Sequence, residues 1–392
     1  MENEKRKNIY RSIMLVIVVA IVTFVVTSII RYDGSRKYLI TAQGETDIRQ
    51  QLESAITSIS EILEEKYIGE VDKDELIDGA LKGMVESIGD VYTTYYTEEE
   101  LDDFTATTLG NFVGIGVYMQ ADLENNTITV LSTIPNSPAE AAGLQEGDQI
   151  IKVDDVEYEA ADLEEVSSKI RGEEGTEVKL TILRNGETLD INVTRGNVHV
   201  NYVTSELLEN NIGYIYIETF DEGCKDDFLN AYNGLVEQGA KSLIIDLRYN
   251  GGGLVDEALD IAELICDKDD VLLITADKDG NKEITKSEKD PVITMPVVVI
   301  TNEASASASE ILAAALKDND KAEIVGERTY GKGVIQELIY LSNGGALKVT
   351  SQEYYTPKEE KINEVGIEPD YAVTGINEQL EKAKEILNEK MK

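Results

Sequence analysis

The 392-residue sequence predicts a multidomain α+β protein with an N-terminal transmembrane helix, a helical segment, a β-rich domain and a layered α/β domain. Three observations predict this class. Residues 12–30 carry no charged side chain, short β-type runs separated by turns fill residues 106–196, and strands alternate with helices across residues 197–375. Such alternation is typical of βα layers around a largely parallel sheet. A chain of this length usually holds two or three domains.

The charge balance and the residue types exclude several classes of function. Lys and Arg number 36 against 76 Asp and Glu, a net charge of −40, which repels a phosphate backbone and argues against nucleic-acid binding. One histidine, His199, and two cysteines, Cys224 and Cys266, cannot build a zinc site of the usual Cys/His kind. We therefore expect no metal and no cofactor, and we expect the cysteines to be buried free thiols.

The first feature along the chain is a membrane segment. Residues 12–30 read SIMLVIVVAIVTFVVTSII, long enough to cross about 30 Å of hydrocarbon. Four basic residues precede it, Lys5, Arg6, Lys7 and Arg11. The positive-inside rule therefore predicts a single-pass protein of the cell membrane, with residues 1–11 in the cytoplasm and the rest outside. A cleaved signal peptide is the alternative, but the apolar run is longer than usual and no A-x-A-like site follows it.

Two further segments are predicted to be helical. Within residues 45–105, Leu52, Ile56, Ile59 and Leu63 recur at three- and four-residue spacing, which indicates an amphipathic helix. Its apolar stripe is a packing surface, either against the body of the protein or against a second subunit, so a homodimer is one expectation. Residues 376–392 form a short amphipathic C-terminal helix.

Chemistry is concentrated in residues 197–375, at turns that follow buried strands. A strand over residues 243–247 runs into Gly251, Gly252 and Gly253, whose backbone amides could surround an anion, although a flexible connection would look the same. A second strand is followed by Ser305, Ser307 and Ser309 at the start of a helix. One of these serines could be a nucleophile at the helix N-terminus, or it could simply cap the helix.

Lys332 lies between two glycines and is the candidate general base. The segment from Gly326 to Gly333 fits G-x-x-x-x-G-K, but Gly333 stands where a nucleotide-binding loop needs Ser or Thr. Solvated charge is the default for a lysine, but burial lowers the pKa of its ammonium, and the neutral amine is a base. A Ser–Lys pair suits a chain with one histidine. Gln336 lies four residues on, on the same face of a predicted strand, where its amide could orient the lysine.

Taken together, these motifs resemble the carboxy-terminal processing peptidases, or tail-specific serine proteases. The likeness extends over most of residues 45–392 and rests on Ser305-Ala306-Ser307-Ala308-Ser309-Glu310, on Gly331-Lys332-Gly333 with Gln336, and on Asp246-Leu247-Arg248 with the glycine run. The resemblance implies Ser307 as nucleophile, Lys332 as base and Gln336 as the orienting amide. It also implies an oxyanion hole formed by the amide of Ala308 and that of Gly252 or Gly253.

The middle of the chain fits the same resemblance. Gly114-Ile115-Gly116-Val117 resembles the carboxylate-binding loop of a PDZ domain, which would span residues 106–196 and precede a crotonase-like protease core at residues 197–375. Such a loop holds the carboxylate of a peptide or protein with a free C-terminus. The sequence thus indicates a membrane-anchored serine endopeptidase. The alternative is a catalytically silent PDZ-type receptor or scaffold, which would have no use for the complete Ser307, Lys332 and Gln336 set.

Overall fold

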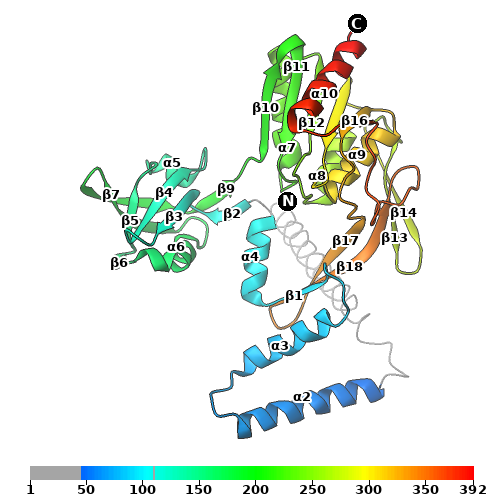
Figure 1. Cartoon of the computed structure of the whole chain (residues 1–392). Helices are drawn as coiled ribbons and strands as arrows, with labels where there is room; N and C mark the ends of the chain where they lie inside the picture. Colours follow the sequence, from blue (N-terminus) through cyan, green and yellow to red (C-terminus); the bar gives the residue numbers. More distant parts are fainter. Residues whose placement is uncertain (1–45, 109–110) are drawn as a thin grey trace, which may run out of the picture. The chain divides into compact units, whose positions relative to one another are not determined.

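The computed structural model describes residues 46–108 and 111–392, which divide after residue 84 into two compact units (Figure 1). No helix within the described residues combines the length and the apolar character needed to span a membrane. The anchor expected at residues 12–30 lies outside the described residues, so it stays a prediction.

The described part of the first unit is helical, as expected. Helix α2 spans Thr46–Lys66, and α3 spans Lys73–Glu86 and ends just inside the second unit. The apolar stripe is formed, and its members Ile56, Ile59 and Ile77 are about half exposed in the single chain. The structure therefore confirms the amphipathic helices and leaves open what covers their apolar face.

The β-rich domain is built on one antiparallel sheet with strand order β3-β4-β5-β7-β8, with a short β6 (Val156–Glu157) beside β5. These strands span Val117–Asp122, Thr127–Thr133, Gln149–Val153, Glu177–Arg184 and Glu187–Thr194. Helices α5 (Pro138–Ala141) and α6 (Leu163–Ile170) complete the domain, whose core includes Val130, Ile150, Val166 and Ile182. The entering and leaving segments pair as β2 (Asn111–Gly114) and β9 (Gly196–His199).

The second domain of this unit is a layered α/β fold around a six-stranded sheet with strand order β10-β11-β12-β15-β16-β19. Its strands span Val203–Leu208, Ile212–Ile217, Ser242–Asp246, Val297–Thr301, Ala322–Gly326 and Tyr371–Ala372. All neighbouring pairs are parallel except β10 with β11, so the prediction of a largely parallel sheet is confirmed.

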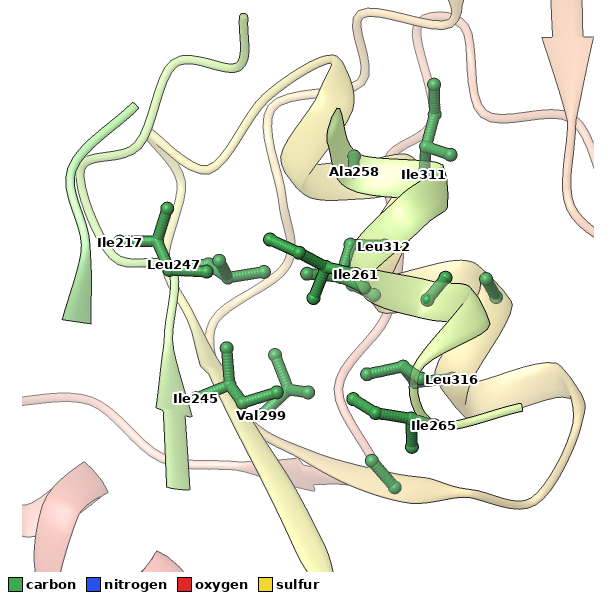
Figure 2. Packing of buried hydrophobic residues seen from close by; sticks show 14 of the residues in the cluster. Ile217, Ile245, Leu247, Ala258, Ile261, Ile265, Val299, Ile311, Leu312 and Leu316 are labelled. Carbon is green, nitrogen blue, oxygen red and sulfur yellow. The ribbon is translucent and has the colours of Figure 1, made fainter. Parts of the chain in front are cut away.

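Helices cover both faces of this sheet because its central strands alternate between two cores. Ile245 and Val299 face α7 (Cys224–Glu237), α8 (Val255–Glu263) and α9 (Ala308–Asp318). Figure 2 shows this packing, with Ile261 and Leu312 directed at those strand residues. Ile244 and its counterparts on β15 and β16 instead pack against α10 (Ile376–Lys390). Strands buried on both faces explain the continuous apolar runs in the sequence.

A second, antiparallel sheet has the order β1-β18-β13-β14, with β17 also paired to β18. These strands span Thr94–Tyr96, Ala346–Tyr355, Val271–Asp277, Lys282–Lys286 and Val334–Tyr340. Strand β1, which precedes α4 (Glu98–Thr108), pairs with β18 over Lys348 to Ala346. The sequence did not indicate this pairing because the two strands lie about 250 residues apart along the chain. Cys224 and Cys266 are buried and free, as expected.

Leu312 offers a test of the layered packing. It is fully buried on α9, so Leu312→Ala should destabilise the protein by about 2–5 kcal/mol through lost transfer free energy and the cavity left behind. Exposed Val236 on α7 is the control, and Val236→Ala should change stability by less than about 0.5 kcal/mol. Urea denaturation of both variants checks this. Equal midpoints for Leu312→Ala and the wild type would contradict the packing.

Candidate active site

Three parallel strands end at one edge of the six-stranded sheet, and each continues into a loop that holds predicted site residues. Strand β12 leads to the glycine run at residues 251–253, β15 leads to Ser307, and β16 leads to Lys332. The carboxyl ends of parallel strands are where open α/β sheets place their ligand sites. Segments up to 80 residues apart in sequence therefore meet here.

Ser307 occupies a sharp turn at the start of α9. Its backbone has φ 56° and ψ −116°, a conformation that costs a non-glycine residue roughly 1–3 kcal/mol. The surrounding contacts hold it there: the Ser307 amide donates to the Glu310 carboxylate at 2.9 Å, and the Glu310 amide donates back to the Ser307 carbonyl at 2.8 Å. Ser307 is thus the N-cap residue of the helix and is itself only partly buried at the helix N-terminus.

The three serines of the motif differ in what their hydroxyls do. Ser305 and Ser309 are fully buried, and their hydroxyls donate to the carbonyl oxygens of Leu247 at 2.8 Å and Asn250 at 2.9 Å. Both therefore fasten the β15–α9 turn to the loop after β12. Only Ser307 is partly exposed and lines the large cavity at this edge of the sheet. Its side chain is the one of the three that a bound molecule can reach.

The glycine run packs directly against the serine. A Cβ added to Gly252 would lie 2.7 Å from the Cβ of Ser307 and 3.1 Å from the amide nitrogen of Ala308, so only glycine fits there. The Gly252 amide donates to the Asn250 side chain at 2.8 Å and is therefore occupied. The amides of Gly253 and Ala308 donate to no acceptor among the described residues, and Gly253 lines the cavity.

Lys332 enters the same cavity from the loop between β16 and β17. The loop can take this path because Gly333 lies against the backbone of Asn363, where an added Cβ would come within 2.2 Å of the amide nitrogen. The Lys332 side chain is half-buried, and its Nζ lies 4.7 Å from the ring centroid of Tyr92 in a cation–π contact. It makes no hydrogen bond with Ser307 within the described part of the chain.

The environment of Lys332 favours the neutral amine. Burial lowers the pKa of Lys332, the positive charge of Lys348 lowers it further, and the Glu310 carboxylate acts in the opposite direction. The net effect is a lowered pKa. An amine with a lowered pKa next to an accessible serine can act as a general base.

Glu310 connects the serine turn to the lysine loop, a role that the sequence did not reveal. Its side chain is fully buried, and its two oxygens accept from the amides of Ser307 and Lys332 at 2.9 and 2.8 Å and from Thr329 Oγ1 and the Gly331 amide at 2.6 and 2.7 Å. No cation pairs with it among the described residues. Four donors replace the water that a buried carboxylate loses.

Tyr354 forms a second bridge between the same two loops. Its hydroxyl, on β18, donates to the carbonyl of Lys332 and lies 3.1 Å from that of Ser307. Burial raises the pKa of Tyr354 well above its usual value, so the hydroxyl keeps its proton and remains a donor.

The loop after β12 is fixed by a buried ion pair. The Arg248 guanidinium donates to the Asp246 carboxylate through two of its nitrogens. Its third nitrogen donates to the Ile376 carbonyl at 2.8 Å and to Gln379 Oε1 at 3.1 Å, both on α10. The Asp246-Leu247-Arg248 motif is therefore a structural support. Asn250 continues it by donating to the Ile217 carbonyl at 2.9 Å.

Gln336 also lines the cavity, from strand β17, but its amide contacts a different residue from the one expected. Its Nε2 donates to Thr350 Oγ1 at 3.3 Å, and it makes no hydrogen bond with Lys332 within residues that the structure describes. Ser307, Lys332 and Gln336 thus share one cavity without mutual hydrogen bonds. Catalytic contacts of this kind often tighten only when substrate binds.

The cavity itself has a volume of about 650 Å³ and is largely apolar. Its walls combine the polar candidates with aliphatic and aromatic side chains, among them Phe104, Leu254, Val255, Val334, Ile335 and Leu338. A site of this size and character suits the side chains of a bound peptide.

The predicted peptide loop of the β-rich domain lies between β2 and β3. Gly114 ends β2, Val117 begins β3, and Ile115 is buried. Gly116 has φ +78° and packs so closely on Ser137 that an added Cβ would lie 2.4 Å from the serine Cβ. Strand β3 is the terminal strand of its sheet, so its outer edge can accept an added strand.

Sequence reasoning missed the residues that hold the site together. Glu310 entered only as the last residue of the serine motif, and Asn250, Tyr354 and Tyr92 received no role. Asn250 carried a usable signal, because a polar residue that follows a buried strand often lies at a site. Tyr92 and Tyr354 carried none, because their contacts depend on how the second sheet pairs.

Comparison with known proteins identifies the same domains. The profile described as Peptidase family S41 matches residues 211–373, that of the PDZ domain matches residues 112–194, and that of the activating protease CtpB N-terminal domain matches residues 16–100. The chain is 38% identical over 310 residues to the carboxy-terminal processing protease CtpA of Bacillus subtilis, with 79% of this chain and 66% of that protein covered.

A further relative by sequence agrees. The carboxyl-terminal-processing protease of Picosynechococcus is 36% identical over 299 residues, covering 75% of this chain and 72% of that protein. Among solved structures, the photosystem II D1 C-terminal processing protease is 30% identical, covers 81% of this chain and 86% of its own, and has a TM-score of 0.48. On the strength of the sequence relatives and the domain profiles, the chain belongs to the carboxy-terminal processing proteases of peptidase family S41 and carries a PDZ domain.

Proposed function

We propose that this protein is a membrane-anchored serine endopeptidase that cuts the C-terminal tails of extracytoplasmic proteins by a Ser–Lys mechanism. One observation carries the proposal. Of the three serines in the motif, only Ser307 reaches the cavity, and that cavity also holds Lys332, whose pKa is lowered by burial. The anchor and the extracytoplasmic side rest on the charge-free run at residues 12–30 and the basic residues before it.

The reaction begins with attack of Ser307 Oγ on the carbonyl carbon of the scissile peptide bond. As the C–O bond forms, the hydroxyl proton passes to the neutral amine of Lys332, and the π electron pair moves onto the carbonyl oxygen. For this step the Lys332 side chain leaves the ring of Tyr92 and turns toward Ser307. The Gln336 amide is the group we propose to orient the amine in that position.

The oxyanion is held by the amides of Ala308 and Gly253. Two features support this choice over Gly252: the Gly252 amide already donates to Asn250, and Gly253 lines the cavity. The tetrahedral intermediate collapses as Lys332 returns its proton to the leaving amine, which leaves an acyl-enzyme on Ser307. Water then attacks the ester, gives a proton to Lys332, and the serine is released with that proton.

The PDZ domain would deliver the substrate. Backbone amides between Gly114 and Val117 would bind the terminal carboxylate, while the tail adds as a strand beside β3. The open edge of β3 supports this mode.

Ser307→Ala should abolish cleavage while the protein still folds, because loss of a nucleophile costs serine enzymes several orders of magnitude in rate. Peptide cleavage followed by mass spectrometry, with circular dichroism as the folding check, measures this. Ser309→Ala is the matched control and should retain turnover, since that hydroxyl only supports the Asn250 carbonyl. An active Ser307→Ala with a dead Ser309→Ala would reverse the assignment, and a wild type that binds tails without cutting them would favour the receptor alternative.

The Lys332→Arg variant tests whether Lys332 acts as a general base or only as a positive charge. Guanidinium keeps the charge but cannot lose a proton in the working range, so this variant should fail as badly as Lys332→Ala. Steady-state kcat for the two variants and the wild type decides the matter. Near-normal kcat in Lys332→Arg would end the general-base proposal.

Amidation of a substrate's C-terminus should weaken processing, because it removes the carboxylate that residues 114–117 would bind. The measurement is kcat/KM for the acid and amide forms of one peptide. Equal values would refute tail recognition by the carboxylate and leave the protease assignment intact.

A further inference from the structure

A second lysine, Lys348, lies in the same cavity as Ser307 and Lys332. It comes from strand β18, where its backbone pairs with Thr94 of β1 on one side and Leu338 of β17 on the other. Its Nζ donates to the Tyr96 hydroxyl at 2.9 Å and lies 5.3 and 5.0 Å from the ring centroids of Tyr96 and Phe104. The two rings are stacked with their centroids 4.8 Å apart, and together they hold the Lys348 ammonium in place.

Among the side chains that the structure describes, those in contact with the Lys348 ammonium are the Tyr96 hydroxyl and the rings of Tyr96 and Phe104, and no carboxylate forms a salt bridge with it. Two acidic side chains, Asp256 and Glu257, also line the cavity, but Glu257 accepts from the amides of Gly223 and Lys225 at 2.9 and 2.7 Å. In a chain with a net charge of −40, a lysine placed in a catalytic cavity without a carboxylate partner requires an explanation.

We propose that Lys348 is a positioning residue for the general base: its fixed positive charge repels a second charge in the cavity and so keeps the amine of Lys332 free to accept the serine proton. This inference rests on the proposed function, in which Lys332 is the base. Its physical basis is that a like charge nearby disfavours the ammonium form.

The groups that face Lys332 are consistent with this role. Burial lowers the pKa of Lys332 most, and the positive charge of Lys348 on β18 lowers it further. The Glu310 carboxylate on α9 raises it. The Tyr92 ring, from the segment before β1, also favours the ammonium. Tyr354 on β18 is a neutral phenol because burial raises its pKa well above the usual value. On α8, Asp256 and Glu257 add negative charge at the cavity wall. Lys348 is thus the one cation among these groups that opposes protonation of Lys332.

The side chains of the two lysines have different surroundings. Lys348 contacts two stacked rings and donates to a hydroxyl, whereas Lys332 contacts one ring and donates no side-chain hydrogen bond within the described part of the chain. Lys348 is therefore the more firmly held of the two, and its position in the cavity is fixed by contacts that do not involve Lys332.

The test is the pH dependence of kcat/KM for the full chain with a peptide that has no ionisable side chain. Lys348→Gln should lower kcat/KM roughly three- to tenfold on the ascending limb, because Lys332 then holds its proton to higher pH, and the deficit should shrink as pH rises. Lys348→Arg keeps the charge and should stay within about twofold of wild type at each pH.

Lys382→Gln is the matched control, because Lys382 also lies over a tyrosine ring, that of Tyr371 at 5.1 Å, but on α10 and paired with Glu385. It should leave the profile unchanged. A deficit in Lys348→Gln that is equal at every pH would overturn the inference, since it would mean a substrate contact or a structural role. A pH profile of Lys348→Gln that matches the wild type would also overturn it. A Lys348→Arg variant that loses activity like Lys348→Gln would do the same. None of these outcomes touches the proposed function, which depends on Ser307 and Lys332 and is tested by their own variants.

Discussion

The active site depends on one buried carboxylate. Glu310 accepts four hydrogen bonds, one from the serine turn and three from the loop that carries Lys332, and it does so without a cation. Burying a carboxylate costs free energy unless hydrogen-bond donors replace the lost water, so the two loops must lie close together to supply those donors. Tyr354 repeats the connection through the carbonyls of the same two loops. The separation of Ser307 and Lys332 is thereby set by contacts to the backbone of their two loops.

The strained backbone of Ser307 is maintained by the contacts around it. With its positive φ, Ser307 lines the cavity, while Ser305 and Ser309 on either side donate hydrogen bonds to the loop after β12. The six-stranded sheet provides the support, because strands buried on both faces resist the shifts that would relax the turn. The helices α8 and α9 that pack on one face begin at the glycine run and at the serine, so packing and site geometry share the same elements (Figures 1 and 2).

The groups around Lys332 shift its pKa in opposite directions. Burial and Lys348 favour the neutral amine of Lys332, while Glu310 and the Tyr92 ring favour the ammonium. In the mechanism we propose, Lys332 accepts a proton and later returns it, and such a balance suits that role because a strongly held proton would not reach the leaving amine. The Tyr92 ring, just before β1, supplies part of this balance.

The sequence by itself determined the elements and the reactive residue types. Apolar runs located the strands of the parallel sheet, and the motif around Ser307 and Lys332 indicated the chemistry, because both depend on neighbours within a few residues. Only the tertiary structure decided which serine reaches the cavity, which glycine amide is unoccupied, and that Glu310 and Lys348 influence the pKa of Lys332. Those answers depend on loops and strands brought together across tens to hundreds of residues, and local sequence carries no record of such contacts.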